Sequence, residues 1–321
     1  MLREDLYARP RFPEEFAQDA DGGLEWFMPD RQEYQQEVRA FLQKHFSIHD
    51  WVFSLPHGTG METYFVQGNE QTYFVKVGGL VERYLAMAEI GLTPPVPLYG
   101  QLESGLSIMV QPIIAGRKPT QADYRNQLEK VATIIRKMHH HPRVKGILQG
   151  AASNLYKDVG LRALNHLRQK WESYKAQVPL VSDFVDNSLD YLAQQANQLS
   201  GEGLVVSHGD ICNANWLFAS DGKVYVLDFE SMSMDDPALD IGALLWWYYP
   251  PELRQQFLDI VGYRYDDEFK FHMQIRMAMH CLDITLPRKQ SFDKFDPNKY
   301  DKSLRDFRAV FEGKENPAGY N

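Results

Sequence analysis

Three oxygen-bearing side chains follow two short apolar runs in the middle of the chain. In "LVVSHGDICNANWLF" (204–218), Asp210 follows the first run, and Asn215 comes five residues later. A second run, "VYVLDFE" (224–230), delivers Asp228 at its end. Phosphoryl transfer needs a carboxylate that orients a hydroxyl and takes up its proton, together with oxygen ligands for Mg²⁺. We therefore predict Asp210 as the catalytic residue, and Asn215 and Asp228 as Mg²⁺ ligands.

Two predicted strands position these side chains. The runs 204–207 and 224–229 are short and apolar, and "ASDG" (219–222) between them supplies the turn of a hairpin. Gly209 lets the backbone turn tightly before Asp210. A lone Asp or Asn in a loop is usually a turn former. The prediction of chemistry therefore depends on the three side chains occurring together.

A lysine in the first half of the chain completes the pattern. "YFVKV" places Lys76 at the end of a predicted strand, directly before a predicted helix, "GGLVERYLAMAEIGL" (78–92). Kinases hold the nucleotide phosphates with a strand lysine that pairs with a helix glutamate. We predict that Lys76 does so and that Glu82 is its partner, with Glu89 as the alternative. Taken alone, Lys76 would be interpreted as a lysine that faces water.

A glycine-containing loop lies between the first two predicted strands. In "PHGTGMETY", Gly58 and Gly60 let the backbone pass close to nucleotide phosphates, where free N–H groups favour anions. The third glycine of the protein-kinase GxGxxG pattern is replaced by Thr63. Any hairpin could use two glycines, so the phosphate contact of Gly58 and Gly60 is an expectation that depends on the rest of the site.

The distribution of strands and helices predicts an α+β chain with two lobes. We expect a leader over 1–30, a small N-lobe with an antiparallel sheet over 31–112, and a larger, mainly helical C-lobe over 113–321. The N-lobe begins with a helix over 31–46, where apolar residues recur at helical spacing. Short segments rich in aromatic and β-branched residues then predict its strands: "WVFSLP", "ETYFVQG", "QTYFVKV" and "GLSIMVQP".

Composition narrows the functional classes. A chain of 321 residues is too long to fold around one small core, so its length favours two lobes. The formal charge of −9 argues against a nucleic-acid partner, because such proteins usually carry a basic face. The two cysteines, Cys212 and Cys281, lie far apart and predict neither a disulfide framework nor a zinc site. With no apolar leader and no run long enough to cross a membrane, we expect a soluble cytoplasmic protein.

Three motifs in order resemble the aminoglycoside phosphotransferase family, a branch of the protein-kinase-like fold that includes choline, fructosamine and homoserine kinases. "HGDICNAN" (208–215) resembles the catalytic loop of the family, and "VLDFE" (226–230) its metal-binding strand. "DDPALDIGAL" (235–244) is similar to its Asp-Pro-x-x-Asp motif. The resemblance implies a protein-kinase-like bilobal fold with ATP bound between the lobes. Glu230 stands where protein kinases have the glycine of the DFG triplet.

The resemblance also implies roles for residues outside the predicted catalytic trio. Asp240 corresponds to a residue that braces the catalytic loop, and His208 to one that packs under this loop and orients it. "IMVQPIIAG" (108–116) resembles the connection between the lobes. There, backbone atoms near Gln111 and Ile113 would form hydrogen bonds with adenine.

The leading hypothesis is an ATP- and Mg²⁺-dependent kinase that phosphorylates a hydroxyl group of a small molecule, as aminoglycoside phosphotransferases do. The negative charge of Glu230, Asp235 and Asp236 favours a cationic acceptor, unless these residues only form a solvated turn. The run "WWYY" (246–249) is interpreted as core, although a ring facing the site would favour an amine. No nucleic acid and no membrane is expected as a partner.

Three alternatives compete with this hypothesis. One is a choline-, ethanolamine- or homoserine-type metabolite kinase of the same fold. A second is a nucleotide-binding module without turnover, a pseudokinase. A third is a metal-dependent phosphohydrolase that would use His208, Asp210, Asp228 and the histidines 139–141. Adjacent helical residues point about 100° apart, so the three histidines cannot all face one ion.

Overall fold

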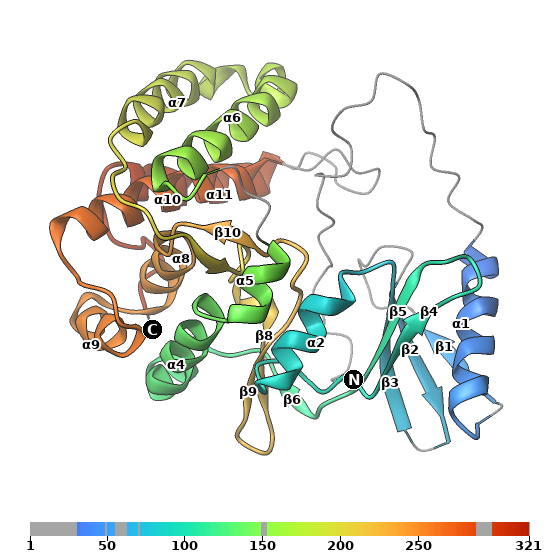
Figure 1. The fold of residues 1–321 in the computed structure, drawn as a ribbon. Helices are drawn as coiled ribbons and strands as arrows, with labels where there is room; N and C mark the ends of the chain where they lie inside the picture. The colour runs from blue at the N-terminus through green and yellow to red at the C-terminus, as the bar shows by residue number, and fades with distance from the viewer. Residues whose placement is uncertain are drawn as a thin grey trace. The chain divides into compact units, whose positions relative to one another are not determined.

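The computed structural model describes residues 31–48, 50–54, 63–69, 71–148, 153–286 and 297–320 (Figure 1). The chain divides into two compact units. Unit 1 comprises Met1–Pro119 and Cys212–Met232, and unit 2 comprises Thr120–Ile211 and Ser233–Asn321. The segment Cys212–Met232 thus belongs with the N-terminal sheet, whereas we had assigned it to the C-lobe. The expected leader over 1–30 lies outside the described residues.

Unit 1 is built on an antiparallel sheet, as the sequence predicted. Within the described residues its strand order is β1-β2-β3-β5-β4. The strands are β1 (Val52–Ser54), β2 (Thr63–Gly68), β3 (Gln71–Val77), β4 (Leu98–Gln101) and β5 (Ser107–Pro112). Two helices accompany them, α1 (Arg31–His45) and α2 (Val81–Glu89).

The two faces of this sheet have different neighbours. Helix α1 carries Tyr34, Val38 and Leu42 on one face, because residues four apart lie above one another in a helix. These side chains pack into one buried core with Val75 and Val77 of β3, and α1 lies along this face in Figure 1. Side chains alternate along a strand. The odd-numbered residues of β3 therefore face α1, and the even-numbered ones face the other side.

A second, smaller sheet of unit 1 carries the predicted metal-binding segment. In the described part of the chain it consists of β6 (Gly116–Arg117), β8 (Trp216–Ala219) and β9 (Val224–Val226), with β8 in the middle. Strands β8 and β9 form an antiparallel hairpin whose turn contains the predicted stretch 219–222. The predicted pairing of the runs 204–207 and 224–229 is wrong, because this turn joins 224–226 to the strand directly before it, whereas 205–207 pairs with 233–235. The Val226 N–H donates to the Leu92 carbonyl at 2.7 Å, which ties the hairpin to the segment after α2.

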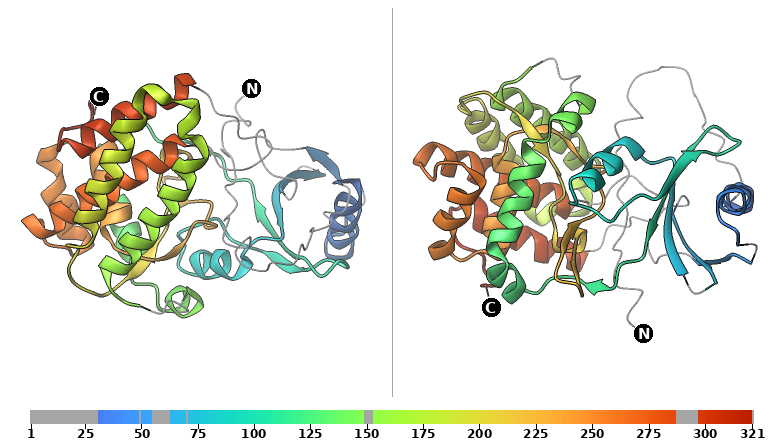
Figure 2. Two further views of the ribbon diagram at one scale, coloured as in Figure 1. Left: turned by 90° about the horizontal axis from the view of Figure 1, so that it is seen from above. Right: turned by 60° about the horizontal axis from the view of Figure 1, so that its bottom comes forward.

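Unit 2 is mainly helical, and the α+β prediction is confirmed. The long helix α10 (Asp267–Thr285) contacts several other helices, and α6 and α7 lie side by side (Figure 2). The described strands of this unit, β7 (Val205–Ser207) and β10 (Ser233–Asp235), form an antiparallel pair. The other helices are α3 (Gln121–Asn126), α4 (Leu128–His139), α5 (Pro142–Leu148), α6 (Tyr156–Tyr174), α7 (Ser182–Ala196), α8 (Ala238–Tyr248), α9 (Pro251–Val261) and α11 (Pro297–Phe311).

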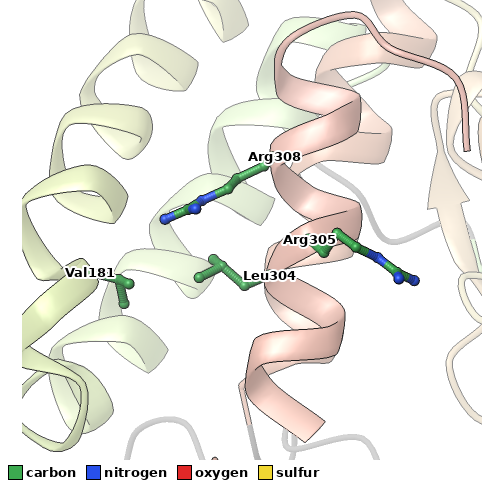
Figure 3. Close-up of a pocket in the computed structure, with 4 residues that line it drawn as sticks. All are labelled: Val181, Leu304, Arg305 and Arg308. Carbon is green, nitrogen blue, oxygen red and sulfur yellow. The ribbon is translucent and has the colours of Figure 1, made fainter. Parts of the chain in front are cut away.

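Unit 2 also contains a pocket of about 320 Å³ lined by Val181, Leu304, Arg305 and Arg308. Figure 3 shows Leu304 and Arg308 of α11 extending toward Val181, whereas Arg305 points the other way. The lining residues that the structure describes provide guanidinium and aliphatic groups.

No helix within the described ranges is both long and apolar enough to cross a bilayer.

Candidate functional site

The β8–β9 hairpin brings the two predicted metal ligands to adjacent positions of the backbone. Trp216 pairs with Val226, and the Leu227 N–H donates to the Asn215 carbonyl at 2.8 Å. Asn215 therefore lies opposite Leu227, and Leu227 directly precedes Asp228. A carboxamide and a carboxylate at neighbouring strand ends are oxygen donors of the kind that Mg²⁺ accepts.

The backbone at Asp228 has an unusual conformation. Its φ is +64°, and the one other non-glycine residue of the described chain with positive φ is Asn69. Left-handed backbone costs an L-residue roughly 1–2 kcal/mol, and Asp and Asn tolerate it best. Such outliers persist where the surrounding structure holds them, often at functional sites. Asp228 lies two residues after the last residue of β9, Val226.

Lys76 lies buried at the end of β3 and is held by a carboxylate from the same unit. Its Nζ lies 2.5 Å from Glu230 Oε1 and 3.9 Å from Asp228 Oδ1. Lys76 Nζ also donates to the Tyr84 hydroxyl at 3.3 Å, and this hydroxyl donates to Glu230 Oε2 at 2.7 Å. Lys76, Tyr84 and Glu230 thus form one connected network, named here the lysine network.

The predicted pair between Lys76 and Glu82 is wrong. The side chain of Glu82 is exposed, and the carboxylates that reach Lys76 belong to Glu230 and Asp228. The helix geometry explains the difference, since two residues of an α-helix turn it by about 200°. Tyr84 lies on the buried face of α2 with Met87, so Glu82 lies on the opposite face. The alternative partner, Glu89, is exposed as well.

The electrostatics of the lysine network follow from its burial. Burial by itself would raise the pKa of the Glu230 carboxyl, but the Lys76 charge and hydrogen bonds from its neighbours lower it to about 2. Burial and the adjacent charges of Glu230 and Asp228 hold the pKa of the Tyr84 hydroxyl well above its ordinary value. Glu230 is therefore an acceptor and Tyr84 a donor at neutral pH.

The predicted adenine-binding segment is tied into the sheet. The Ile113 N–H donates to the Thr72 carbonyl at 3.1 Å, and the buried side chain of Gln111 donates to the Pro94 carbonyl at 2.6 Å. Antiparallel pairs alternate between hydrogen-bonded and non-hydrogen-bonded, so the next pair, Tyr73 with Pro112, is of the second kind. The Pro112 carbonyl therefore points away from β3. Proline fits this position because it has no N–H to donate.

Gly58 and Gly60, the predicted phosphate-binding glycines, lie outside the described residues.

The predicted catalytic residue, Asp210, belongs to unit 2 and is 3% exposed. It follows β7 by way of Gly209, whose φ of +74° requires a left-handed turn. Within this turn, the Asp210 N–H donates to His208 Nδ1 at 3.3 Å. The boundary between the units falls between Ile211 and Cys212. The catalytic loop thus begins in unit 2 and continues into unit 1.

Asp240 holds the turn that precedes Asp210. Its buried carboxylate accepts hydrogen bonds from the N–H groups of His208, at 2.7 Å, and Gly209, at 3.1 Å. The ring of His139 lies on the same carboxylate, with Nε2 at 3.3 Å from Oδ2. Although burial raises the pKa of Asp240, the hydrogen bond and charge of His139, together with the other donors, lower it below its ordinary value. The carboxylate is thus charged and fixed at neutral pH.

The three adjacent histidines have different surroundings. His139 contacts Asp240 and also lies 3.1 Å from the Tyr263 hydroxyl through Nδ1. The ring of His140 stacks on Tyr263, and His141 Nδ1 accepts from a backbone N–H three residues later. In the parts of the chain that the structure describes, no three His, Cys, Asp or Glu residues are grouped so as to hold a metal.

The acidic residues that favoured a cationic acceptor have partners within the protein. Arg276 Nη2 lies 2.6 Å from Asp235 Oδ1, and His272 Nδ1 lies 2.9 Å from Asp236 Oδ2. Glu230 is bound to Lys76. The interpretation as a solvated turn is wrong, because Asp236 is fully buried. These carboxylates hold the fold together and supply no argument for a cationic substrate.

The run 246–249 is largely packed into unit 2. Trp246 and Tyr249 are buried, and Tyr248 stacks on Tyr124 with ring centroids 4.1 Å apart. Trp247 is half-buried, and its carbonyl accepts a hydrogen bond from Gln121. The aromatic run thus contributes mainly to the core.

The comparison with protein families gives one match that spans most of the site. Residues 54–273 match the phosphotransferase enzyme family (APH). The chain belongs to this family. The matched range contains Lys76, Asp210, Asn215, Asp228 and Glu230.

Solved structures of phosphotransferases and of a choline kinase have a fold similar to that of this chain. A putative aminoglycoside phosphotransferase from Ralstonia eutropha JMP134 has a TM-score of 0.62 at 16% identity, covering 87% of this chain and 97% of that one. The choline kinase LicA from Streptococcus pneumoniae has a TM-score of 0.58 at 15% identity, with coverages of 86% and 99%. APH(2")-IIia, in a complex with GDP and kanamycin, has a TM-score of 0.59 at 14% identity, with coverages of 88% and 99%. The fold is therefore the protein-kinase-like fold of this family.

Sequence reasoning missed the part that Glu230 and Tyr84 play in holding Lys76. In the sequence, Glu230 stands out only as a departure from the DFG triplet and as one of three negative charges near the predicted site. A carboxylate that directly follows an apolar strand needs a buried cation or donors if it turns inward. That requirement, together with a buried strand lysine, was the available signal.

Proposed function

We propose that this member of the phosphotransferase family is an ATP-dependent kinase that transfers the γ-phosphoryl group to a hydroxyl of a small molecule. The observation that carries the proposal is the arrangement in unit 1. There, a buried lysine is ion-paired at the end of β3, close to the Asp228 carboxylate, and Asn215 lies at the neighbouring strand end. This combination of a fixed cation and oxygen ligands suits a nucleotide triphosphate bound with Mg²⁺.

Each residue has a distinct role in the proposed reaction. Lys76 binds the nucleotide phosphates, and Asn215 and Asp228 would hold Mg²⁺. When bound, the ion would neutralise charge on the phosphates. Asp210 orients the acceptor hydroxyl and accepts its proton, while Asp240 keeps the turn before Asp210 in place. Catalysis of this kind comes mainly from placement and charge stabilisation.

Adenine binding is proposed at the end of β5. The Ile113 N–H is used within the sheet, and the Pro112 carbonyl points away from β3. Ile114 is the second residue after the end of β5 at Pro112. We place the adenine edge against the Pro112 carbonyl and the Ile114 N–H, one residue beyond the Gln111 and Ile113 positions of the sequence prediction. Recognition through backbone atoms leaves the side chains in this segment free to serve the core.

The acceptor is tested by an ADP-release screen of the purified protein with ATP and MgCl₂. The acceptors are aminoglycosides, choline, ethanolamine, homoserine, thiamine, methylthioribose and fructosamines. The neighbours include both an aminoglycoside complex and a choline kinase, so the screen must cover both classes. Release with metabolites alone favours the metabolite-kinase alternative. Nucleotide binding without release with any acceptor favours the non-catalytic module.

Matched variants identify the chemistry in this screen. Asp210→Asn should lower turnover by roughly a thousandfold or more while ADP binding is retained, because the change removes the proton acceptor and not the nucleotide site. Asp221→Asn is the control, since its half-exposed side chain pairs with Lys223 in the β8–β9 turn. Wild-type turnover in Asp210→Asn would refute the assigned role of Asp210.

A further inference from the structure

Glu230 occupies a position that couples three parts of unit 1. It binds Lys76 of β3, it accepts a hydrogen bond from Tyr84 of α2, and it lies two residues after Asp228 on the same short segment. Its side chain is buried, with 5% exposed. The carboxylate that fixes the lysine therefore comes from the segment that carries the predicted metal ligand, and not from the helix.

Helix α2 contributes donors to this segment in place of a carboxylate. Arg83 Nη1 donates to the carbonyls of Phe229 and Glu230, each at 3.0 Å. Tyr84 also packs its ring edge-on against Phe229, with centroids 5.1 Å apart. Neighbouring residues of α2 thus bind the backbone and the side chain of the same short segment. The expected arrangement was a glutamate on the helix that pairs with the strand lysine. Here the glutamate belongs to the segment after β9, and the helix provides hydrogen-bond donors to it.

The surrounding backbone leaves little room for the Lys76–Glu230 pair to rearrange. A Cβ at Gly79 would lie 3.3 Å from Cδ and Cε of Lys76 and 3.4 Å from Glu230 Oε1. Glycine at this position therefore lets the main chain pass directly over the pair. A buried ion pair that is enclosed and hydrogen-bonded holds both partners in one geometry.

We propose that Glu230 is the positioning residue that fixes Lys76 for nucleotide binding, with Tyr84 holding the carboxylate from α2. This inference rests on the proposed function, because it assigns Lys76 to the nucleotide phosphates. Lys76 and Asp228 are then set by one rigid segment, so that the phosphate-binding cation and the metal ligand keep their spacing. The exposed Glu82 has no part in this arrangement.

The test is a double-mutant cycle on the affinity for ADP, measured by calorimetry with MgCl₂ and repeated in EDTA. Glu230→Gln and Lys76→Met should each weaken binding by about 10- to 100-fold, the range for a charged hydrogen bond. The double variant should bind no more weakly than the worse single variant, because Glu230 acts through Lys76. Glu82→Gln, the same change on the exposed face of α2, should stay within about twofold of wild type.

A second variant covers the case in which Glu230→Gln fails to fold. Tyr84→Phe removes one hydroxyl from the lysine network and keeps the ring against Phe229. It should weaken ADP binding by about three- to tenfold, with a cooperative thermal transition that confirms folding. The loss should persist in EDTA, because Tyr84 acts on Glu230 and not on the metal.

Several results would overturn the inference. Additive losses in the cycle would show that Glu230 acts independently of Lys76. A loss confined to MgCl₂ would make Glu230 a metal ligand instead of a positioning residue. Tighter binding in Glu230→Gln would mean that Glu230 competes with phosphate for Lys76, and a large effect of Glu82→Gln would restore the helix glutamate. If wild-type protein binds no ADP, the proposed function fails together with the inference, whereas binding that is unaffected by Glu230→Gln refutes the inference alone.

Discussion

Asp240 offers a direct test of how the catalytic loop is held. Its carboxylate accepts from the backbone N–H groups of His208 and Gly209 and from the ring of His139, and it is 1% exposed. In Asp240→Asn, one of the two oxygens becomes an NH₂ group that cannot accept. If the remaining oxygen keeps the His208 contact, the Gly209 N–H faces a donor and is left with its 3.2 Å contact to Ser207 Oγ.

The expected cost follows from the hydrogen bonds. Losing a hydrogen bond to a charged acceptor costs about 1.5–3 kcal/mol. Where exchange proceeds by local opening, this corresponds to roughly 10- to 150-fold faster exchange of the amides involved. The measurement is hydrogen–deuterium exchange of the peptide that spans 204–211. Turnover should fall in parallel, because Asp210 follows directly on the loosened turn.

The control and the pH dependence make this test specific. Asp267→Asn is the same change at a fully exposed carboxylate that pairs with Lys270, and it should leave the exchange of 204–211 unchanged. Because the pKa of Asp240 is lowered in the folded state, its contribution is complete above the unfolded value of about 4 and is lost as the pH falls below it. The part of the difference between wild type and Asp240→Asn that comes from the ionisation of Asp240 should therefore be present at neutral pH and shrink as the pH falls below about 4. Equal protection of 204–211 in both proteins at neutral pH would refute this account of the loop.

Three further predictions concern stability. Arg276→Met leaves Asp235 buried without its cation and should lower the unfolding free energy in urea by about 3–5 kcal/mol. This loss should shrink at low pH, because burial already raises the pKa of the Asp235 carboxyl and the carboxyl can take up a proton. Gly68→Ala should cost about 1–3 kcal/mol, since its Cβ would lie 2.5 Å from the ring of Trp51; an unchanged thermal midpoint would contradict this packing. Asp228→Asn should be as stable as wild type, because Asn tolerates a left-handed backbone, whereas Asp228→Ala should lose roughly 1–2 kcal/mol of unfolding free energy. Neither variant should produce ADP from ATP in the acceptor screen. Equal urea midpoints for the two variants would show that the positive φ is not enforced.

The fold was predictable because its signals are local. Alternating strands such as 71–77 and the stripe of α1 each identify a buried face from a few consecutive residues. The hairpin turn at 219–222 is likewise indicated by four consecutive residues, "ASDG". The assignment of 212–232 to unit 1 was not local, since it depends on pairing of β8 with the distant strand β6. A short two-residue strand such as β6 has too little pattern to be identified in advance.

The partner of Lys76 shows where such inference fails and why. A glutamate six residues after a strand lysine satisfies the expected spacing, but spacing along a helix does not determine which face turns inward. That choice is made by burial, and on α2 it falls to Tyr84, whose ring fills the core while its hydroxyl serves Glu230. Glu82 would have had to be desolvated on the face that now meets water. The chain offers both Glu82 and Glu230 as carboxylates that could pair with Lys76. Burying a carboxylate costs free energy, and for Glu230 the contacts with both Tyr84 and Lys76 offset that cost.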